Sequence, residues 1–62
     1  GPLGALPLKE AREKLLGDFE RTYLAEHLAR HQGNIAETAR SIGVSRQSLY
    51  ELLNHHGLRG AR

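Results

Sequence analysis

The spacing of four residues in the second half of the chain restricts its fold most strongly. Ala39 is followed four residues later by Gly43, and two leucines, Leu49 and Leu52, come six and nine residues after that glycine. Two short helices joined by a turn of three or four residues cross at a steep angle, so the residue at the crossing must be small, as Ala39 is. Gly43 can adopt the positive φ that such a turn needs. Since Leu49 and Leu52 then share a face that closes on Ala39, the spacing predicts a helix-turn-helix.

Capping residues place the two helices of this unit. Asn34 can cap a helix over residues 34–42, with Glu37 reaching back to it in a capping box. The Ser45 hydroxyl can cap a second helix over residues 45–56. We call this second helix the probe helix, because a helix-turn-helix holds it out as a rigid element.

A long helix is predicted before this unit. Its apolar residues recur at steps of three and four, as on one face of a helix, and comprise Leu8, Ala11, Leu15, Phe19, Tyr23, Leu24 and Leu28. The pattern predicts a helix over residues 8–32, closed by Gly33 in the left-handed conformation. It keeps its phase across Gly17, where the helix can bend without stopping. With no β pattern elsewhere, we expect an all-α chain.

Composition narrows the class of protein further. A chain of 62 residues forms one small domain, whose core contributes only a few kcal/mol. Cysteine is absent, which excludes disulfides and thiolate metal sites and favours a reducing compartment, the cytoplasm. No apolar run approaches the roughly 20 residues that cross a bilayer, so we expect no membrane segment.

The two ends of the chain differ from the rest. Residues 1–4 read "GPLG", which resembles the scar of a cleaved fusion tag and indicates a domain taken from a longer protein. The single domain is then expected over residues 5–62, with a frayed tail over residues 60–62.

Charge is unevenly distributed along the chain, although its net value is only +2. Residues 5–29 contain four basic and five acidic side chains, a net charge of −1. Residues 30–62 contain five basic and two acidic side chains, a net charge of +3. The predicted helix-turn-helix therefore lies in the basic half.

In DNA-binding helix-turn-helix units the probe helix enters the major groove with its N-terminal end. Arg46 is the best candidate for reading a base, because a guanidinium can donate two hydrogen bonds to guanine, while Gln47 can pair with adenine. Phosphate contacts, which position the protein without reading sequence, are expected from Arg40, Ser45, Ser48 and Tyr50. The outward positions of the probe helix comprise Ser45, Arg46, Gln47, Ser48, Tyr50, Glu51 and Asn54.

An unbroken order of markers carries a family resemblance: "FERTYL", then "GN", then "ARSIGVSRQSLY", then "HGL". This stretch, about two-thirds of the chain, resembles the Fis-type C-terminal DNA-binding domain of NtrC-like bacterial enhancer-binding proteins, which activate transcription with the nitrogen-type alternative sigma factor. The resemblance implies a bacterial, nucleoid-associated homodimer that binds double-stranded DNA at inverted repeats upstream of promoters. It also implies a parent protein with an ATPase domain.

The residues carried over from the family follow its motif. Arg46 matches the arginine just after the turn, Ser45 and Ser48 match small polar positions that contact the DNA backbone, and Gly33 with Asn34 matches the helix junction. One departure follows Leu49, where the family commonly has several lysines or arginines and this chain reads "YEL". Fewer cations imply weaker and less salt-sensitive DNA binding.

Two histidines near the end of the probe helix can partly replace the missing cations. His55 and His56 carry positive charge when protonated, and we expect them to add to the attraction for phosphate in that form.

Part of the apolar stripe predicts dimerisation. A helix from residue 8 to residue 31 is about 36 Å long, and two short helices cover only part of that length. Pairing with a second copy in a two-fold dimer would bury the rest. The dimerisation residues are expected to be Leu8, Leu15, Leu16 and Phe19.

Other chemistry finds little support in the sequence. No phosphate-binding glycine loop is present, so we expect no enzyme here and place the ATPase outside the chain. His27 and His31 lie four residues apart but lack the pattern of a zinc protease, so we read them as surface histidines, with no metal or cofactor. The main alternative to DNA binding is a helix-turn-helix that docks a protein partner, which Glu51 on the probe helix favours. A plain three-helix bundle with solvated arginines is the simplest alternative.

Overall fold

The computed structural model describes residues 2–58. Its helices follow one another along the chain as a short 3-10 helix and three α-helices: η1 (Pro2–Ala5), α1 (Leu8–Arg30), α2 (Ile35–Ile42) and α3 (Arg46–His55). No strand occurs within residues 2–58, and the all-α prediction, with a long helix before a helix-turn-helix, is confirmed. The tail expected over residues 60–62 lies outside the described residues.

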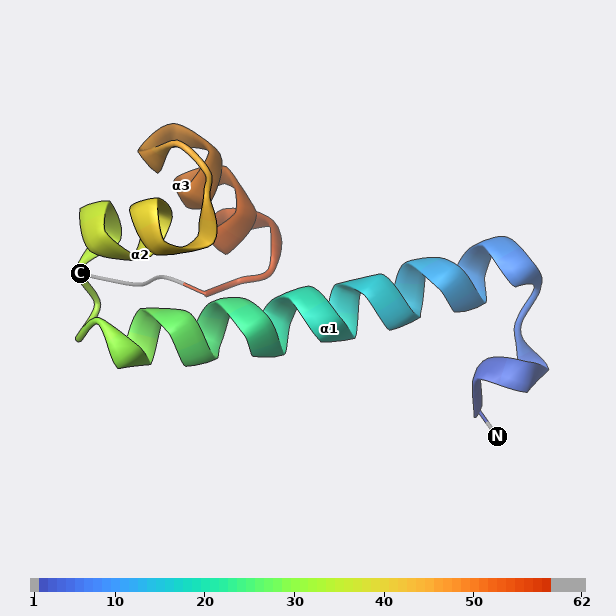
Figure 1. Ribbon diagram of the computed structural model, residues 1–62. Helices are drawn as coiled ribbons and strands as arrows, with labels where there is room; N and C mark the ends of the chain where they lie inside the picture. The colour runs from blue at the N-terminus through green and yellow to red at the C-terminus, as the bar shows by residue number, and fades with distance from the viewer. Residues whose placement is uncertain (1, 59–62) are drawn as a thin grey trace.

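Helix α1 dominates the shape of the molecule, which measures 38 × 19 × 18 Å. Helices α2 and α3 lie over its C-terminal half, and its N-terminal half extends beyond them toward η1 (Figure 1). Three of the four residues that we set aside as a tag scar belong to η1, so they adopt a helical turn. Their origin from a tag stays a prediction.

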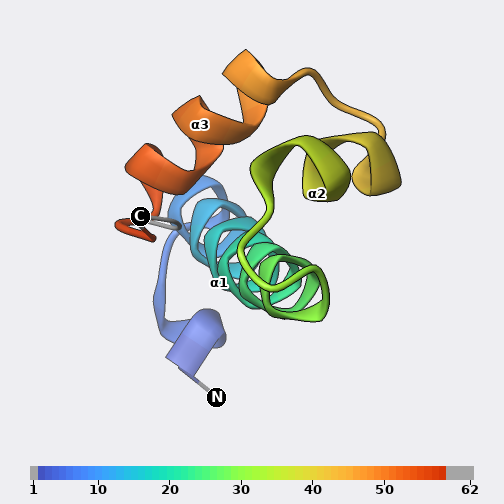
Figure 2. The same cartoon turned by 90° about the vertical axis from the view of Figure 1, so that its left-hand side faces the viewer.

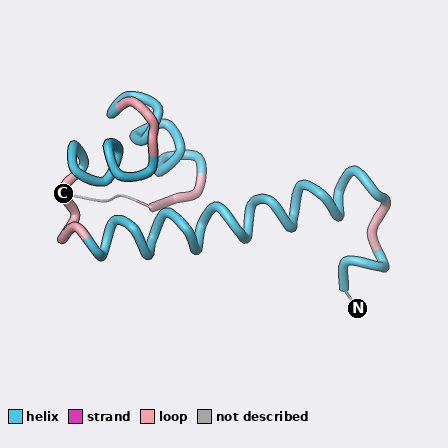
Figure 3. The backbone as a smooth tube through the Cα atoms, viewed as in Figure 1, coloured by secondary structure: helices cyan, strands magenta, loops and turns pink. Residues whose placement is uncertain are grey.

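Gly17 does not interrupt α1. The helix continues through it. The backbone tube of the long first α-helix is unbroken along its whole length (Figure 3). A Cβ at Gly17 would meet no atom within 4 Å, so neither close packing nor a turn requires glycine at this position.

The end of α1 differs from the prediction by two residues. The helix ends at Arg30 instead of Gln32, because the left-handed conformation begins at Gln32, with φ of 54°. Gly33 follows it with φ of 78°, so the left-handed conformation predicted for Gly33 is confirmed. Its N–H donates to the carbonyl of Ala29 at 3.1 Å, and the N–H of Gly33 donates to that of Leu28 at 2.8 Å. This pair of bonds is the Schellman arrangement, which satisfies carbonyls of the last turn.

The start of α2 forms only half of the predicted capping box. Oδ1 of Asn34 accepts a hydrogen bond from the N–H of Glu37 at 3.0 Å, as expected. The carboxylate of Glu37 does not reach back, because it binds Nη2 of Arg40 at 2.6 Å instead. A cation is a stronger donor to a carboxylate than a neutral amide, and the N–H of Asn34 already donates to the carbonyl of His31 at 3.0 Å.

The turn between α2 and α3 depends on Gly43. Its φ is 84°, the left-handed conformation predicted for it. Its N–H and that of Val44 both donate to the carbonyl of Ala39, at 2.9 and 3.0 Å. Ser45 then caps α3, since its Oγ accepts from the N–H of Ser48 at 3.0 Å. The chain thus reverses and restarts a helix within three residues.

The core lies where the three α-helices meet. Its four buried apolar residues come from all three helices and are Leu24, Ala39, Leu49 and Leu53. Leu52, which we placed with Leu49 on the inner face, is half-buried against this core, while Leu53 is buried. The polar Thr38 is also buried, and its hydroxyl donates to the carbonyl of Asn34 at 2.7 Å. None of the described helices is long and apolar enough to cross a membrane.

Candidate nucleic-acid interface

Helix α3 is presented with its N-terminal end outward. In both ribbon views its first turn lies farther from α1 than its last turn does (Figures 1 and 2). Leu49 and Leu53, four residues apart, anchor its inner face in the core. The first turn contains no acidic residue. This orientation leaves the positive end of the helix dipole open to an anion.

The residues predicted to contact DNA all lie on exposed surface. The structure brings seven of them together on α3 and its cap, and Arg40 lies on the exposed side of α2. Those on α3 and its cap are Ser45, Arg46, Gln47, Ser48, Tyr50, Glu51 and Asn54. Their contacts with DNA stay predictions.

Arg46 is the cation of this surface best suited to contact DNA. It is the first residue of α3, it is exposed, and it forms no ion pair with any residue of the described range. An arginine with no competing carboxylate can turn its five donors toward an acceptor.

Three of the predicted phosphate-binding residues have side-chain partners within the chain. Oγ of Ser45 donates to Oγ of Ser48 at 3.0 Å in addition to capping α3, so its hydroxyl proton is already used. Arg40 is paired with Glu37, but both side chains are at least half exposed. An exposed pair contributes at most about 1 kcal/mol, so a phosphate can compete for Arg40.

Glu51 is exposed in the middle of α3, and its side chain forms no hydrogen bond or ion pair within residues 2–58.

The described part of the basic half has a small net charge. Residues 30–58 contain the arginines Arg30, Arg40 and Arg46 and the acids Glu37 and Glu51, a net charge of only +1. The other two basic residues of this half, at positions 59 and 62, lie outside the described residues.

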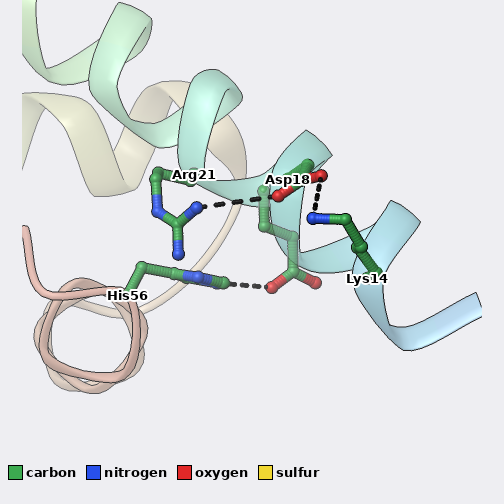
Figure 4. A network of polar contacts seen from close by, with 5 residues as sticks. Lys14, Asp18, Arg21 and His56 are labelled. Carbon is green, nitrogen blue, oxygen red and sulfur yellow. Dashed lines mark hydrogen bonds and ion pairs between the residues drawn. The ribbon is translucent and has the colours of Figure 1, made fainter. Parts of the chain in front are cut away.

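The prediction that His56 adds charge to the DNA-binding surface is wrong. Its side chain is 4% exposed, and its Nε2 lies 2.8 Å from Oε1 of Glu20 on α1 (Figure 4). Only His55 of the two is exposed, and the two rings meet edge to face with centroids 4.8 Å apart. Sequence reasoning missed this contact because its partners are 36 residues apart, and the two markers that contain them give no sign that they meet.

The prediction that His27 and His31 lie on the surface is wrong, because both are half-buried. The ring of His27 lies against Tyr23, with centroids 4.3 Å apart. Nδ1 of His27 and Nε2 of His31 are buried and have no hydrogen-bond partner among residues 2–58. No group of three or more potential metal ligands occurs within the described part of the chain.

The residues predicted to form a dimer contact are exposed in the single chain. The exposed fractions of Leu8, Leu15, Leu16 and Phe19 are 71, 56, 51 and 58%. Phe19 also lines an apolar groove between α1 and the helix-turn-helix, together with Tyr23 and Leu52. The rings of Phe19 and Tyr23 are 5.5 Å apart between centroids.

The capped probe helix, its open N-terminal end and the glycine turn before it define a DNA-binding helix-turn-helix domain. The chain belongs to the family described as "Bacterial regulatory protein, Fis family", whose match spans residues 15–55. It is 45% identical over 56 residues to the nitrogen assimilation regulatory protein NtrX of Azorhizobium caulinodans, covering 90% of this chain and 12% of that protein. The resemblance to the Fis-type domain of NtrC-like regulators is therefore confirmed.

Two further relatives are putative response regulators described as NtrX-like, from Rickettsia conorii and Rickettsia felis. Each is 39% identical to this chain over 49 residues, which is 79% of this chain and 10% of the relative. The chain thus spans between 10 and 12% of the length of these relatives. No solved structure is significantly similar to it.

Proposed function

We propose that this chain is the operator-recognition domain of a bacterial transcription activator and binds inverted repeats in double-stranded DNA as a homodimer. The observation that carries the proposal is the first turn of α3, which is exposed, free of acidic residues and led by Arg46, a residue with no ion pair to any of residues 2–58. Such a turn suits the major groove, where an arginine can contact guanine while the helix N-terminus faces a phosphate.

The dimer is supported by the exposed apolar residues of α1. Four large apolar side chains, each more than half exposed, lie on α1 between Leu8 and Phe19. Exposed apolar residues gathered on one helix support an interaction site, and a two-fold pair of α1 helices would bury them. Both probe helices would then face one side of the DNA, with half-site centres about 34 Å apart.

The wider role rests on the relatives. Because they include a nitrogen assimilation regulator and putative response regulators much longer than this chain, we place the chain within such a regulator. That regulator would carry an ATPase domain, act with the nitrogen-type alternative sigma factor, and work in the bacterial cytoplasm at the nucleoid. In this arrangement the chain recognises the DNA site and performs no catalysis.

Selection of duplexes from a random library by the purified chain tests the proposal. We expect an inverted repeat to be enriched, and affinity for it to fall as salt rises, because bound phosphates release counterions. Enrichment of no sequence, together with no binding to random duplex at low salt, would reject DNA recognition.

A protein-docking role is the second candidate, and it is favoured by Glu51, an exposed residue of α3 that has no ion-pair partner within the described part of the chain. The carboxylate would repel phosphate but could pair with a basic side chain of a partner. Absence of DNA binding at low salt would favour protein docking over DNA recognition.

A further inference from the structure

The contact between Glu20 and His56 ties the helix-turn-helix to α1 at a point remote from the covalent connection. Oε1 of Glu20 accepts from Nε2 of His56 at 2.8 Å, and His56 directly follows the last residue of α3. Within residues 2–58 it is the single side-chain hydrogen bond or ion pair between α1 and the α2–α3 unit. The other ion pairs of α1 that Figure 4 shows, from Asp18 to Lys14 and Arg21, stay within the helix.

The Glu20–His56 bond lies far enough from the covalent connection to restrict rotation of the helix-turn-helix about it. The covalent connection joins α2 to the end of α1 at residues 31–34, whereas Glu20 lies 11 residues before residue 31, roughly 16 Å along the helix. The helix-turn-helix is thus held to α1 at two separated points. The packed apolar core between them restricts how the helices cross, and the hydrogen bond adds a constraint on direction, since it weakens steeply as its angle changes.

His56 is well placed to transmit this constraint to α3. Its ring is buried, its N–H donates to the carbonyl of Leu52 at 3.1 Å, and Leu58 closes the helix by donating to Leu53 at 2.7 Å. The backbone of His56 is therefore held by the cap of α3, and its imidazole is held by Glu20. Movement of α3 relative to α1 must break the bond or distort the cap.

We propose that the Glu20–His56 hydrogen bond is a positioning contact that fixes the angle between α1 and α3. In the dimer proposed above, on which this second step rests, it thereby sets the distance between the two probe helices. A tilt of about 10° displaces one end of a ten-residue helix by roughly 2.6 Å relative to the other, close to the rise of one base pair. Two protomers double the displacement, enough to change the half-site spacing that the dimer recognises.

The angle can be measured without DNA. Because the chain contains no cysteine, spin labels can be attached at Glu10→Cys on α1 and Gln47→Cys on α3, both exposed and both outside the proposed dimer residues. Labelled chain is diluted with unlabelled chain, so that each measured distance lies within one protomer. We expect a single narrow distance distribution, which Glu20→Ala widens by about 3 Å, the displacement that a 10° tilt gives.

Matched variants separate positioning from general loss of structure. Glu20→Gln keeps an acceptor for His56 and should restore the narrow distribution. Asp18→Ala, which removes two exposed ion pairs from the same helix, should leave it unchanged. If Glu20→Ala loses helical content, Glu20→Ser replaces it, since a short polar side chain cannot reach His56 but remains solvated.

A distribution as narrow in the Glu20 variants as in the unaltered chain would overturn the proposal. Loss of helix in both Glu20→Ala and Glu20→Ser would also overturn it, because the bond would then be needed for folding and not for the angle. Neither outcome depends on DNA binding, so this inference and the proposed function can fail separately.

The consequence for DNA is tested on the inverted repeat selected by the unaltered chain. Inserting or deleting one base pair between the half-sites should weaken binding of the unaltered chain about tenfold. Glu20→Ala should bind all three spacings within about threefold of one another, whereas Glu20→Gln should discriminate like the unaltered chain. Equal discrimination by Glu20→Ala would show that the bond does not set the spacing.

Discussion

Ser45 and Ser48 hold the start of α3 through two hydrogen bonds. Oγ of Ser45 accepts from the backbone N–H of Ser48 and donates to its hydroxyl, each at 3.0 Å. The residue that ends the turn is therefore also the one that orients the first turn of α3. Ser45 and Ser48, which we expect to contact DNA, thus also stabilise the start of α3.

Replacing this cap should lower stability. We expect Ser45→Ala to reduce the free energy of unfolding by about 1 kcal/mol, because an N–H of the first turn loses its acceptor. Thermal or urea denaturation followed by circular dichroism measures the change. Ser45→Asp restores a capping acceptor and should recover the stability while weakening DNA binding, since the carboxylate repels phosphate. Equal stability of all three chains would mean that the cap contributes nothing.

Two glycines should respond to alanine in opposite directions. At Gly43, with φ of 84°, Gly43→Ala should cost about 1–2 kcal/mol, because a Cβ is disfavoured in the left-handed conformation even where space is free. At Gly17, within α1, Gly17→Ala should stabilise the chain by about 0.5–1 kcal/mol, since alanine has the higher helix propensity. Denaturation midpoints of the two variants measured side by side check the signs. Stabilisation by Gly43→Ala would contradict the role assigned to the turn.

Charge placed on the exposed apolar residues should abolish the proposed dimer. Sedimentation at tens of micromolar should show a species of twice 6.9 kDa for the unaltered chain and a monomer for Phe19→Glu. A buried carboxylate without a partner opposes association strongly. Thr22→Glu, also on the exposed surface of α1, is the matched control and should remain dimeric. A monomer already in the unaltered chain would show that these residues do not pair the isolated domain.

Removal of the leading arginine of α3 should lower specificity more than general affinity. If Arg46 contacts guanine, Arg46→Ala should cost about 1–3 kcal/mol on the selected repeat and little on random duplex. Titration of both duplexes at one salt concentration gives the ratio. Arg46→Lys keeps the charge but loses the paired donors, so it should retain random binding and lose specificity. An equal loss on both duplexes would make Arg46 a phosphate contact.

Reversal of the charge at Glu51 should have the opposite effect. Glu51→Lys should strengthen binding to all duplexes and steepen the salt dependence by about one unit of log-log slope for one added phosphate contact. Glu26→Lys makes the same charge change at an exposed site on α1 and should alter binding much less. Selective weakening on the repeat would instead identify Glu51 as a base contact. No effect of either the Arg46 or the Glu51 substitution at low salt would mean that α3 does not enter the groove.

Local sequence was sufficient for the elements and their junctions. The left-handed Gly43, the caps at Asn34 and Ser45, and the apolar period of α1 all follow from preferences of residues within four positions of one another. Helix ends were less certain, because Gln32 took a left-handed position that glycine would ordinarily fill. The exposed face of α3 was also predictable, since Leu49 and the polar residues around it follow the helical period.

Tertiary structure alone decided the contacts between distant residues. Nothing near His56 in the sequence indicates that its ring is buried on Glu20, and the pairing exists only because α3 ends beside the middle of α1. Glu37 is a local case of a different kind: its carboxylate could bind either the backbone of Asn34 or the side chain of Arg40, and in the structure it binds the cation. Sequence determines which side chains a helix turns to each face, because its period is local. Which of those side chains meet depends on how the helices cross, and that is settled only when the core of all three packs together.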